Sequence, residues 1–333
     1  MTLKSVQTPL LEVSGLCTTF GGGQASIPAV RDVSFCVNKG EVLGLVGESG
    51  SGKSVTLRSI LGLSRRYGTT TGSVQWRGQN IVETPEAQMR KIRGGEIAMI
   101  FQEPMTSLNP LLTVGLQIDE TLKAHTDMSA SERKKRAIEM LDVVGIPAAA
   151  SRLGEYPHQF SGGMRQRVMI AIALAARPKM LLADEPTTAL DVTIQAQILD
   201  LILSLAQDFD MGVILVTHDL GVVAQTCDQV AVMYAGRIVE QGAVRSVLRA
   251  PQHPYTVGLM RSVPENVPPR TPLYSIPGTP PSLLSLPAGC AFAARCTHKS
   301  EICETSRPDL VGAGTGRSVA CFNQVKSEGG AAA

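Results

Sequence analysis

The sequence has few aromatic residues, little net charge and no long apolar run. Only 4% of the 333 residues are aromatic, and 31 basic against 29 acidic residues leave a formal charge of +2. We therefore expect no nucleic-acid partner, because such partners favour basic surfaces and stacking rings. No apolar run approaches the roughly 18 residues of a membrane-spanning helix. Residues 1–10 also lack the apolar core of a secretion signal. These absences favour a cytosolic chain that could dock on a membrane protein.

The strongest motif is a glycine-rich stretch that fits G-x-x-x-x-G-K-[ST], between a β-prone segment at 41–46 and helical spacing at 55–61. Its residues are Gly47, Glu48, Ser49, Gly50, Ser51, Gly52, Lys53 and Ser54. The glycines let backbone N–H groups face a phosphate at the N-terminus of a helix. Lys53 would meet the β- and γ-phosphates and the Ser54 hydroxyl would meet Mg²⁺. The stretch therefore predicts nucleotide binding.

A second group of candidates follows apolar strands. The segment 180–183 is a predicted strand that delivers Asp184 and Glu185 at its carboxyl end, where α/β sheets bind ligands. Asp184 suits the Mg²⁺ shell, and Glu185 could accept a proton from the water that attacks the γ-phosphate. The alternative is an exposed Asp-Glu loop that caps the next helix. His218 follows the predicted strand 212–217 and is a candidate for γ-phosphate contact, although a single His is more often structural.

Three weaker candidates complete the sites. Ser161, Gly162 and Gly163 stand at the start of a predicted helix that continues through 168–176. The start of this helix is a candidate for a second anion site, with an ordinary helix start as the alternative. Phe20 is a candidate for stacking on adenine, with a core position as the alternative. Gln102 ends the predicted strand 97–101.

The domain organisation follows from periodicity and composition. Helical spacing predicts a helical subdomain at about 103–165, inserted between strands of an α/β core. Residues 1–250 form the predicted nucleotide-binding domain, and 251–333 a proline-rich linker and a cysteine-rich extension. Four of the seven cysteines crowd this extension: Cys290, Cys296, Cys303 and Cys321. In a cytosolic chain clustered thiols indicate metal, but tight C-x-x-C pairs are absent, so metal and free thiols both stay open.

Taken together and in this order, the motifs resemble those of ATPase subunits of ABC transporters, over residues 11–250. The segments 253–256, 289–296 and 105–110 are similar to those of the dipeptide/oligopeptide importer branch. The resemblance implies an α/β P-loop fold with a mixed sheet. It also implies a head-to-tail ATPase pair that shares its ATP molecules. Phe160 and Met164 depart from the common signature, which has Leu and Gln there, and leave the backbone donors unchanged.

The resemblance also implies roles for the site residues. Ser161, Gly162 and Gly163 would contact the γ-phosphate of the partner's ATP, and Asp191 would link the two ATP sites. Gln102 would touch Mg²⁺ or the attacking water. His218 would hold the γ-phosphate, and Phe20 would stack on adenine. Related ATPases hold a [4Fe-4S] cluster on a cysteine pattern similar to this one, with zinc as the alternative metal.

The expected function is ATP hydrolysis that powers import of dipeptides or oligopeptides, at the cytoplasmic face of the membrane. The implied partners are two transmembrane permeases, a second and different ATPase subunit, and an extracytoplasmic solute-binding protein. Nickel, glutathione or an opine are alternative solutes. A soluble ABC ATPase acting on ribosomes or DNA is less expected, because the chain has one ATPase unit and no coiled-coil insertion. A non-hydrolysing regulator is disfavoured by Glu185 and His218.

Overall fold

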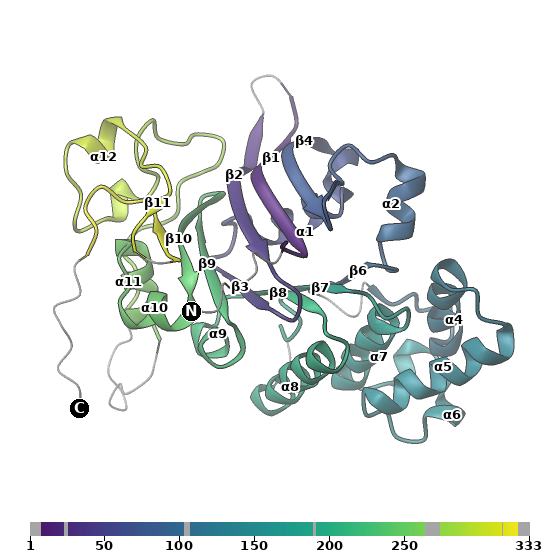
Figure 1. Cartoon of the computed structure of the whole chain (residues 1–333). Helices are drawn as coiled ribbons and strands as arrows, with labels where there is room; N and C mark the ends of the chain where they lie inside the picture. Colours follow the sequence, from purple (N-terminus) through teal and green to yellow (C-terminus); the bar gives the residue numbers. More distant parts are fainter. Residues whose placement is uncertain are drawn as a thin grey trace, which may run out of the picture. The chain divides into compact units, whose positions relative to one another are not determined.

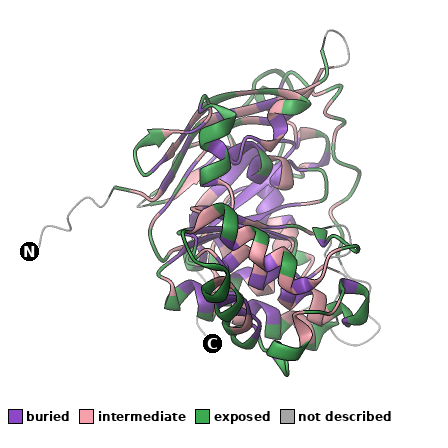
Figure 2. Ribbon diagram, turned by 90° about the vertical axis from the view of Figure 1, so that its right-hand side faces the viewer, coloured by how far each residue is buried: buried purple, intermediate pink, exposed green. Residues whose placement is uncertain are grey.

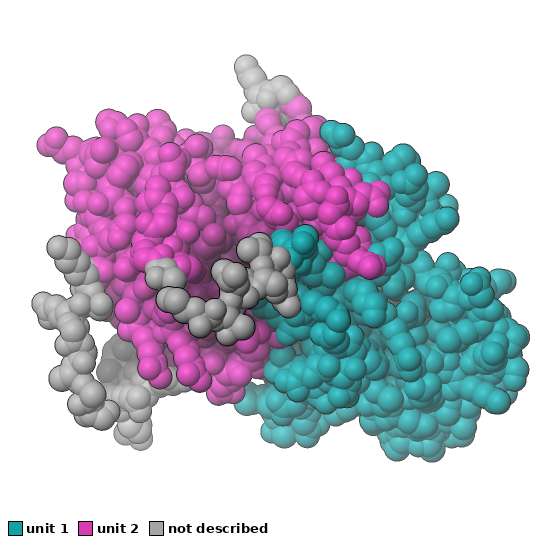
Figure 3. Space-filling model, in the orientation of Figure 1, with its two compact units in different colours: residues 1–10, 37–41, 83–216 teal, residues 11–36, 42–82, 217–333 magenta. Residues whose placement is uncertain are grey.

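A computed structural model describes residues 8–22, 26–102, 107–188, 191–263, 274–314 and 316–325. The chain divides into two compact units, drawn in different colours in Figure 3. Unit 1 comprises residues 1–10, 37–41 and 83–216, and unit 2 comprises 11–36, 42–82 and 217–333. Parts of three sequence-based expectations lie outside the described residues. These are residues 105–106 of the branch-specific segment, residues 189–190 before Asp191, and residues 264–273 of the proline-rich linker.

The strands of unit 1 run parallel. β6 (Ile97–Ile100) pairs with β7 (Met180–Asp184), and β7 pairs with β8 (Gly212–Thr217). β7 and β8 are buried along their whole length, which explains their unbroken apolar sequences. Parallel pairing brings the carboxyl ends of these strands to one edge, where Gln102 and Glu185 follow them.

Unit 1 also contains helices, which Figure 1 labels. They are α2 (Glu86–Ile92), α4 (Val114–His125), α5 (Ala130–Val143), α6 (Ala149–Arg152), the 3₁₀ turn η3 (Pro157–Gln159), α7 (Gly162–Leu174) and α8 (Val192–Asp208). Side-chain caps fix several starts. Ser129 and Glu132 form a reciprocal capping box at α5, and Thr113 caps α4.

Unit 2 contains two groups of strands. One is a sheet with the order β2-β1-β4-β5, and the other has the order β11-β12-β10-β9-β3. The strands are β1 (Leu11–Phe20), β2 (Ile27–Val37), β3 (Val42–Val46), β4 (Gly68–Trp76), β5 (Gln79–Asn80), β9 (Gln229–Tyr234), β10 (Arg237–Ala243), β11 (Val311–Gly312) and β12 (Ser318–Val319). β3 and β9 are parallel, whereas β9 and β10 form an antiparallel hairpin. The mixed sheet that was expected is confirmed.

The helices of unit 2 are short. They are α1 (Lys53–Ile60), η2 (Leu63–Arg66), α9 (Leu220–Thr226), α10 (Val244–Arg249), α11 (Pro254–Arg261), η4 (Ala293–Arg295) and α12 (Ile302–Thr305). Among the described residues, no helix is long and apolar enough to cross a membrane.

The C-terminal extension shares a hydrophobic core with the strands of unit 2. Tyr255 and Phe292, both from the extension, are buried in one cluster with Val46 of β3 and Tyr234 of β9. Their rings meet each other and that of Tyr234, with centroids 4.6–5.4 Å apart. Figure 2 colours the buried residues purple. The burial of these aromatic side chains explains how the extension, which has few regular elements, is ordered, because each aromatic ring removes a large apolar area from water.

A buried ion pair also joins the extension to β10. Glu240 is fully buried and pairs with Arg317. The same carboxylate accepts hydrogen bonds from the backbone N–H groups of Gln252 (2.9 Å) and His253 (3.0 Å). A buried carboxylate needs such partners, since isolating its charge from water is costly.

We predict that Arg317→Met lowers the free energy of unfolding of unit 2 by about 3 kcal/mol, because Glu240 stays buried without its counter-charge. Trp76, the single tryptophan, lies buried in β4 of the same unit, so its fluorescence reports the urea transition. Lys299→Met is the matched control, since it removes the exposed pair with Glu304 and should leave the transition unchanged. Equal midpoints for both variants would contradict the prediction.

Candidate nucleotide-binding site

The predicted phosphate loop lies in unit 2, between the buried strand β3 and the first residue of α1. Gly47 (φ 150°) and Gly52 (φ 103°) adopt conformations that side chains disfavour. A Cβ on Gly47 would come within 2.2 Å of the Met233 carbonyl oxygen, and one on Gly52 within 2.5 Å of the Ala29 oxygen. The glycines therefore keep the loop backbone close to its neighbours and leave no room for side chains.

Lys53 stabilises the loop through hydrogen bonds to the carbonyl oxygens of the loop backbone. Its Nζ donates to the carbonyl oxygens of Gly47 (2.7 Å) and Glu48 (3.0 Å), and the side chain is buried. The hydroxyl oxygen of Ser51 is buried as well and has no hydrogen-bond partner among the described residues. The loop thus concentrates a cation and backbone donors at the start of a helix, an arrangement that suits a phosphate.

The two candidate carboxylates lie at the end of β7 in unit 1. Asp184 is fully buried, and the Glu185 backbone is in the left-handed region (φ 46°). Such a conformation is uncommon for a residue with a side chain and is often found at functional sites. Gln102 Nε2 and Thr188 Oγ1 donate to the same oxygen, Oε2 of Glu185, at 3.0 and 2.9 Å. The structure therefore brings Gln102 and Glu185 together.

The signature residues begin α7 in unit 1. Ser161 caps the helix by accepting a hydrogen bond from the Met164 N–H (3.4 Å), and both Ser161 and Gly162 are exposed. A Cβ on Gly162 would meet nothing within 4 Å. Phe160, which replaces the usual Leu, is buried, so its apolar role is kept. The start of a 13-residue helix is thus open to solvent, as a second anion site requires.

The remaining predicted residues lie at element ends. Asp191 caps α8 by accepting from the Ile194 N–H (2.9 Å). His218 is exposed directly after β8. Phe20 is half-buried at the end of β1, opposite Gly68 of β4. The roles given to these residues in nucleotide contact stay predictions.

The residues predicted to meet Mg²⁺ have the right type of donor atom. Ser54 in unit 2, and Gln102 and Asp184 in unit 1, offer oxygen atoms, which are the ligands that this hard cation prefers. The buried carboxylate of Asp184 at the end of β7 is the type of group that a bound cation would neutralise.

The four clustered cysteines converge on one cavity in unit 2. Cys290, Cys296, Cys303 and Cys321 line it, and no disulfide joins them. Burial raises the thiol pKa of Cys290 and of Cys296, and raises that of Cys321 to about 11. Among the described residues, no group of three or more His, Cys, Asp or Glu side chains is arranged to hold a metal ion. The described residues therefore show no ligand arrangement for the expected [4Fe-4S] cluster or its zinc alternative.

Sequence reasoning missed three residues of the site. Thr188 lies only three positions after Glu185, so the short spacing could have predicted its hydrogen bond to the Glu185 carboxylate. Arg295 pairs with Glu48 of the phosphate loop, and Tyr255 accepts a hydrogen bond from the Glu48 N–H. No local pattern links residues more than 200 positions apart, so these two contacts could not be read from the chain.

Comparison with known proteins places the chain in a class. A family model described as ABC transporter matches residues 30–188. Among solved structures, a dimeric ATP-binding cassette in a post-hydrolysis state with ADP and Pi has a TM-score of 0.63 and 32% identity. The match covers 71% of this chain and 99% of that one. The protein cbiO1 from Clostridium perfringens, part of the ABC transporter complex cbiONQ, has a TM-score of 0.62 and 25% identity, and the match covers 73% of this chain and 92% of that one.

Closer relatives define the branch. The region described as oligopeptide/dipeptide transporter, C-terminal, matches residues 239–303. The oligopeptide transport ATP-binding protein OppD of Salmonella typhimurium is 50% identical over 317 residues, which are 95% of this chain and 94% of that protein. The oligopeptide transport ATP-binding protein AppD of Bacillus subtilis is 50% identical over 94% and 96% of the two chains. The chain therefore belongs to the ABC transporter ATP-binding proteins, in the branch that carries this C-terminal region.

Proposed function

We propose that the chain is the ATPase subunit of an importer of dipeptides or oligopeptides. The observation that carries this proposal is the presence of both family regions on one chain, the ABC transporter region and the oligopeptide/dipeptide transporter C-terminal region. The name of the relatives at 50% identity supports a peptide as the solute. Nickel, glutathione or an opine remain alternative solutes, because this subunit powers transport without selecting what is carried.

The proposed chemistry is hydrolysis of the γ-phosphate of ATP. Gly47 to Ser54 bind the phosphates through backbone N–H groups and Lys53, while Phe20 stacks on adenine and His218 holds the γ-phosphate. Ser54, Gln102 and Asp184 would hold Mg²⁺, which would supply positive charge against the phosphate oxygens.

Glu185 acts as the general base. Its carboxylate takes a proton from the attacking water, whose oxygen bonds to the γ-phosphorus as the bond to the bridging oxygen of ADP breaks. The hydrogen bonds from Gln102 and Thr188 orient this carboxylate.

Dimerisation completes the proposal. Ser161, Gly162 and Gly163 contact the ATP of a second ATPase subunit, and Asp191 links the two sites. We propose a heterodimer with a different ATPase, bound to two transmembrane permeases at the cytoplasmic face of the membrane, with an extracytoplasmic binding protein that delivers the solute. Residues 1–250 serve as the motor and 251–333 as an accessory extension in this scheme.

We predict that Glu185→Gln lowers ATP turnover at least a hundredfold, because the general base is lost while ATP is still bound. The variant should also accumulate as an ATP-bound dimer with the second ATPase subunit, measured by size-exclusion chromatography of the two subunits together, with and without ATP. Glu120→Gln, at an exposed position on α4, is the control and should leave both readouts unchanged. Turnover by Glu185→Gln at the rate of the unmodified chain would remove Glu185 as the base.

The transport role is tested by isolating the tagged chain from gently solubilised native membranes and identifying co-purifying proteins by mass spectrometry. We expect two multi-span permeases and a second ATPase. Ribosomal or DNA-repair proteins without a permease would replace the importer by a non-transport ATPase.

We also propose that the cysteine cavity takes up a metal centre, as a [4Fe-4S] cluster or zinc. The convergence of four thiols on one cavity supports this, but their side chains would have to move into a ligand geometry. We expect iron with acid-labile sulfide, or zinc, in chain purified without oxygen, and its loss in Cys296→Ser. Cys36→Ser, at an exposed position in β2, is the control. Metal-free chain would overturn the proposal.

A further inference from the structure

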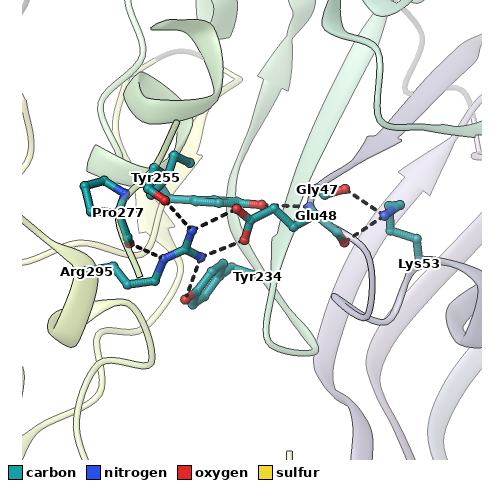
Figure 4. A network of polar contacts seen from close by, with 8 residues as sticks. Gly47, Glu48, Lys53, Tyr234, Tyr255, Pro277 and Arg295 are labelled. Carbon is teal, nitrogen blue, oxygen red and sulfur yellow. Dashed lines mark hydrogen bonds and ion pairs between the residues drawn. The ribbon is translucent and has the colours of Figure 1, made fainter. Parts of the chain in front are cut away.

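Glu48, the second residue of the phosphate loop, is paired with a residue of the C-terminal extension. Arg295 Nη1 donates to Glu48 Oε2 at 2.7 Å, and Arg295 Nη2 donates to Oε1 at 2.9 Å (Figure 4). The Arg295 side chain is 4% exposed and that of Glu48 is 28% exposed. A bidentate pair in which the cation is shielded from water is both stronger and more specific in direction than a surface ion pair.

The guanidinium of Arg295 is itself fixed by its surroundings. Its Nε donates to the Pro277 carbonyl oxygen (2.9 Å), Nη2 also donates to that of Ile276 (3.2 Å), and Nη1 to the Tyr234 hydroxyl (3.3 Å). With the two bonds to Glu48, these contacts match the five N–H groups of an arginine. Hydrogen bonding to Glu48 is the main cause that raises the pKa of Arg295 above its usual value, so the residue stays charged.

The backbone of Glu48 is held at two further points. Its N–H donates to the Tyr255 hydroxyl at 2.8 Å, and its carbonyl oxygen accepts from Lys53 Nζ at 3.0 Å (Figure 4). Tyr255 is fully buried in α11, with its ring against those of Tyr234 and Phe292. The extension therefore contacts the side chain and the N–H of one loop residue, while Lys53 contacts its C=O.

The charge of Glu48 makes this contact important for a phosphate loop. A carboxylate beside the site of a triphosphate repels the ligand, and the repulsion is large where water is partly excluded. Arg295 supplies the opposite charge at hydrogen-bond distance. Its removal would leave a carboxylate without a counter-ion and a loop that is free to reorient.

We propose that the C-terminal extension positions the phosphate loop for ATP, with Arg295 as the positioning residue that neutralises Glu48 and fixes the loop conformation. This rests on the proposed function, in which the loop binds ATP. Preorganisation lowers the cost of ordering the loop on binding, so the extension acts on affinity more than on the chemical step.

The test is a double-mutant cycle for ATP affinity on the full-length chain. Arg295→Met should raise the Kd for ATP about tenfold, and raise the KM of ATP turnover with less than a twofold change in kcat. The double variant Arg295→Met/Glu48→Gln should lose less affinity than the product of the two single losses, because both changes break one interaction. Arg295→Lys keeps the charge without the fork and should recover part of the affinity.

Controls separate this proposal from loss of folding and from the proposed function. Lys299→Met, in another ion pair of the extension, should bind ATP normally. Glu48→Gln is isosteric and breaks the same ion pair by changing the loop residue. Its ATP affinity can therefore still be measured if an Arg295 variant unfolds. A Kd for Arg295→Met within twofold of the unmodified chain, or losses that multiply independently, would overturn the positioning role. Unchanged ATP binding by Lys53→Ala would instead overturn the phosphate-loop assignment.

Discussion

To bind phosphate, the loop must keep its backbone N–H groups facing the ligand, in a conformation that a free chain would not keep. Several contacts within unit 2 fix the loop. Gly47 and Gly52 accept unusual backbone angles, and Lys53 ties the loop carbonyls together. Glu48 is then fixed by Arg295 and Tyr255. Loop order is therefore shared between local residues and a segment that lies more than 200 residues further along the chain.

The C-terminal extension is held to unit 2 by two kinds of interaction. Tyr255 and Phe292 are buried in the cluster that contains Val46, the residue directly before the loop. The buried pair of Glu240 and Arg317 adds a polar anchor beside the first turn of α11. A region that the sequence sets apart by its prolines and cysteines thus shares the core of the strands that carry the loop. The segment that lines the cysteine cavity also contains Arg295, between Cys290 and Cys296.

Local patterns predicted the local parts of the site. The buried strand β3, the glycines and the start of α1 are contiguous, so composition and spacing were enough. Asp184 and Glu185 were expected at the carboxyl end of a strand. That Gln102 donates to Glu185 follows from the parallel pairing of β6 and β7, which brings their carboxyl ends to one edge. The contact of Arg295 with Glu48 depends on tertiary folding and has no signal in the sequence. The clustering of four cysteines in the extension predicted a metal centre. The four side chains line one cavity, but no ligand group for a metal ion is found among the described residues.

The central claim, that the extension holds the phosphate loop in place before ATP arrives, is tested most directly by hydrogen exchange of the loop amides in the nucleotide-free chain. The Glu48 N–H, bonded to the Tyr255 hydroxyl, should exchange slowly in the unmodified chain and at least about tenfold faster in Arg295→Met, since a free loop opens more often. Fast exchange at this amide in both chains would contradict the claim and would leave the extension as a neighbour of the loop rather than its support.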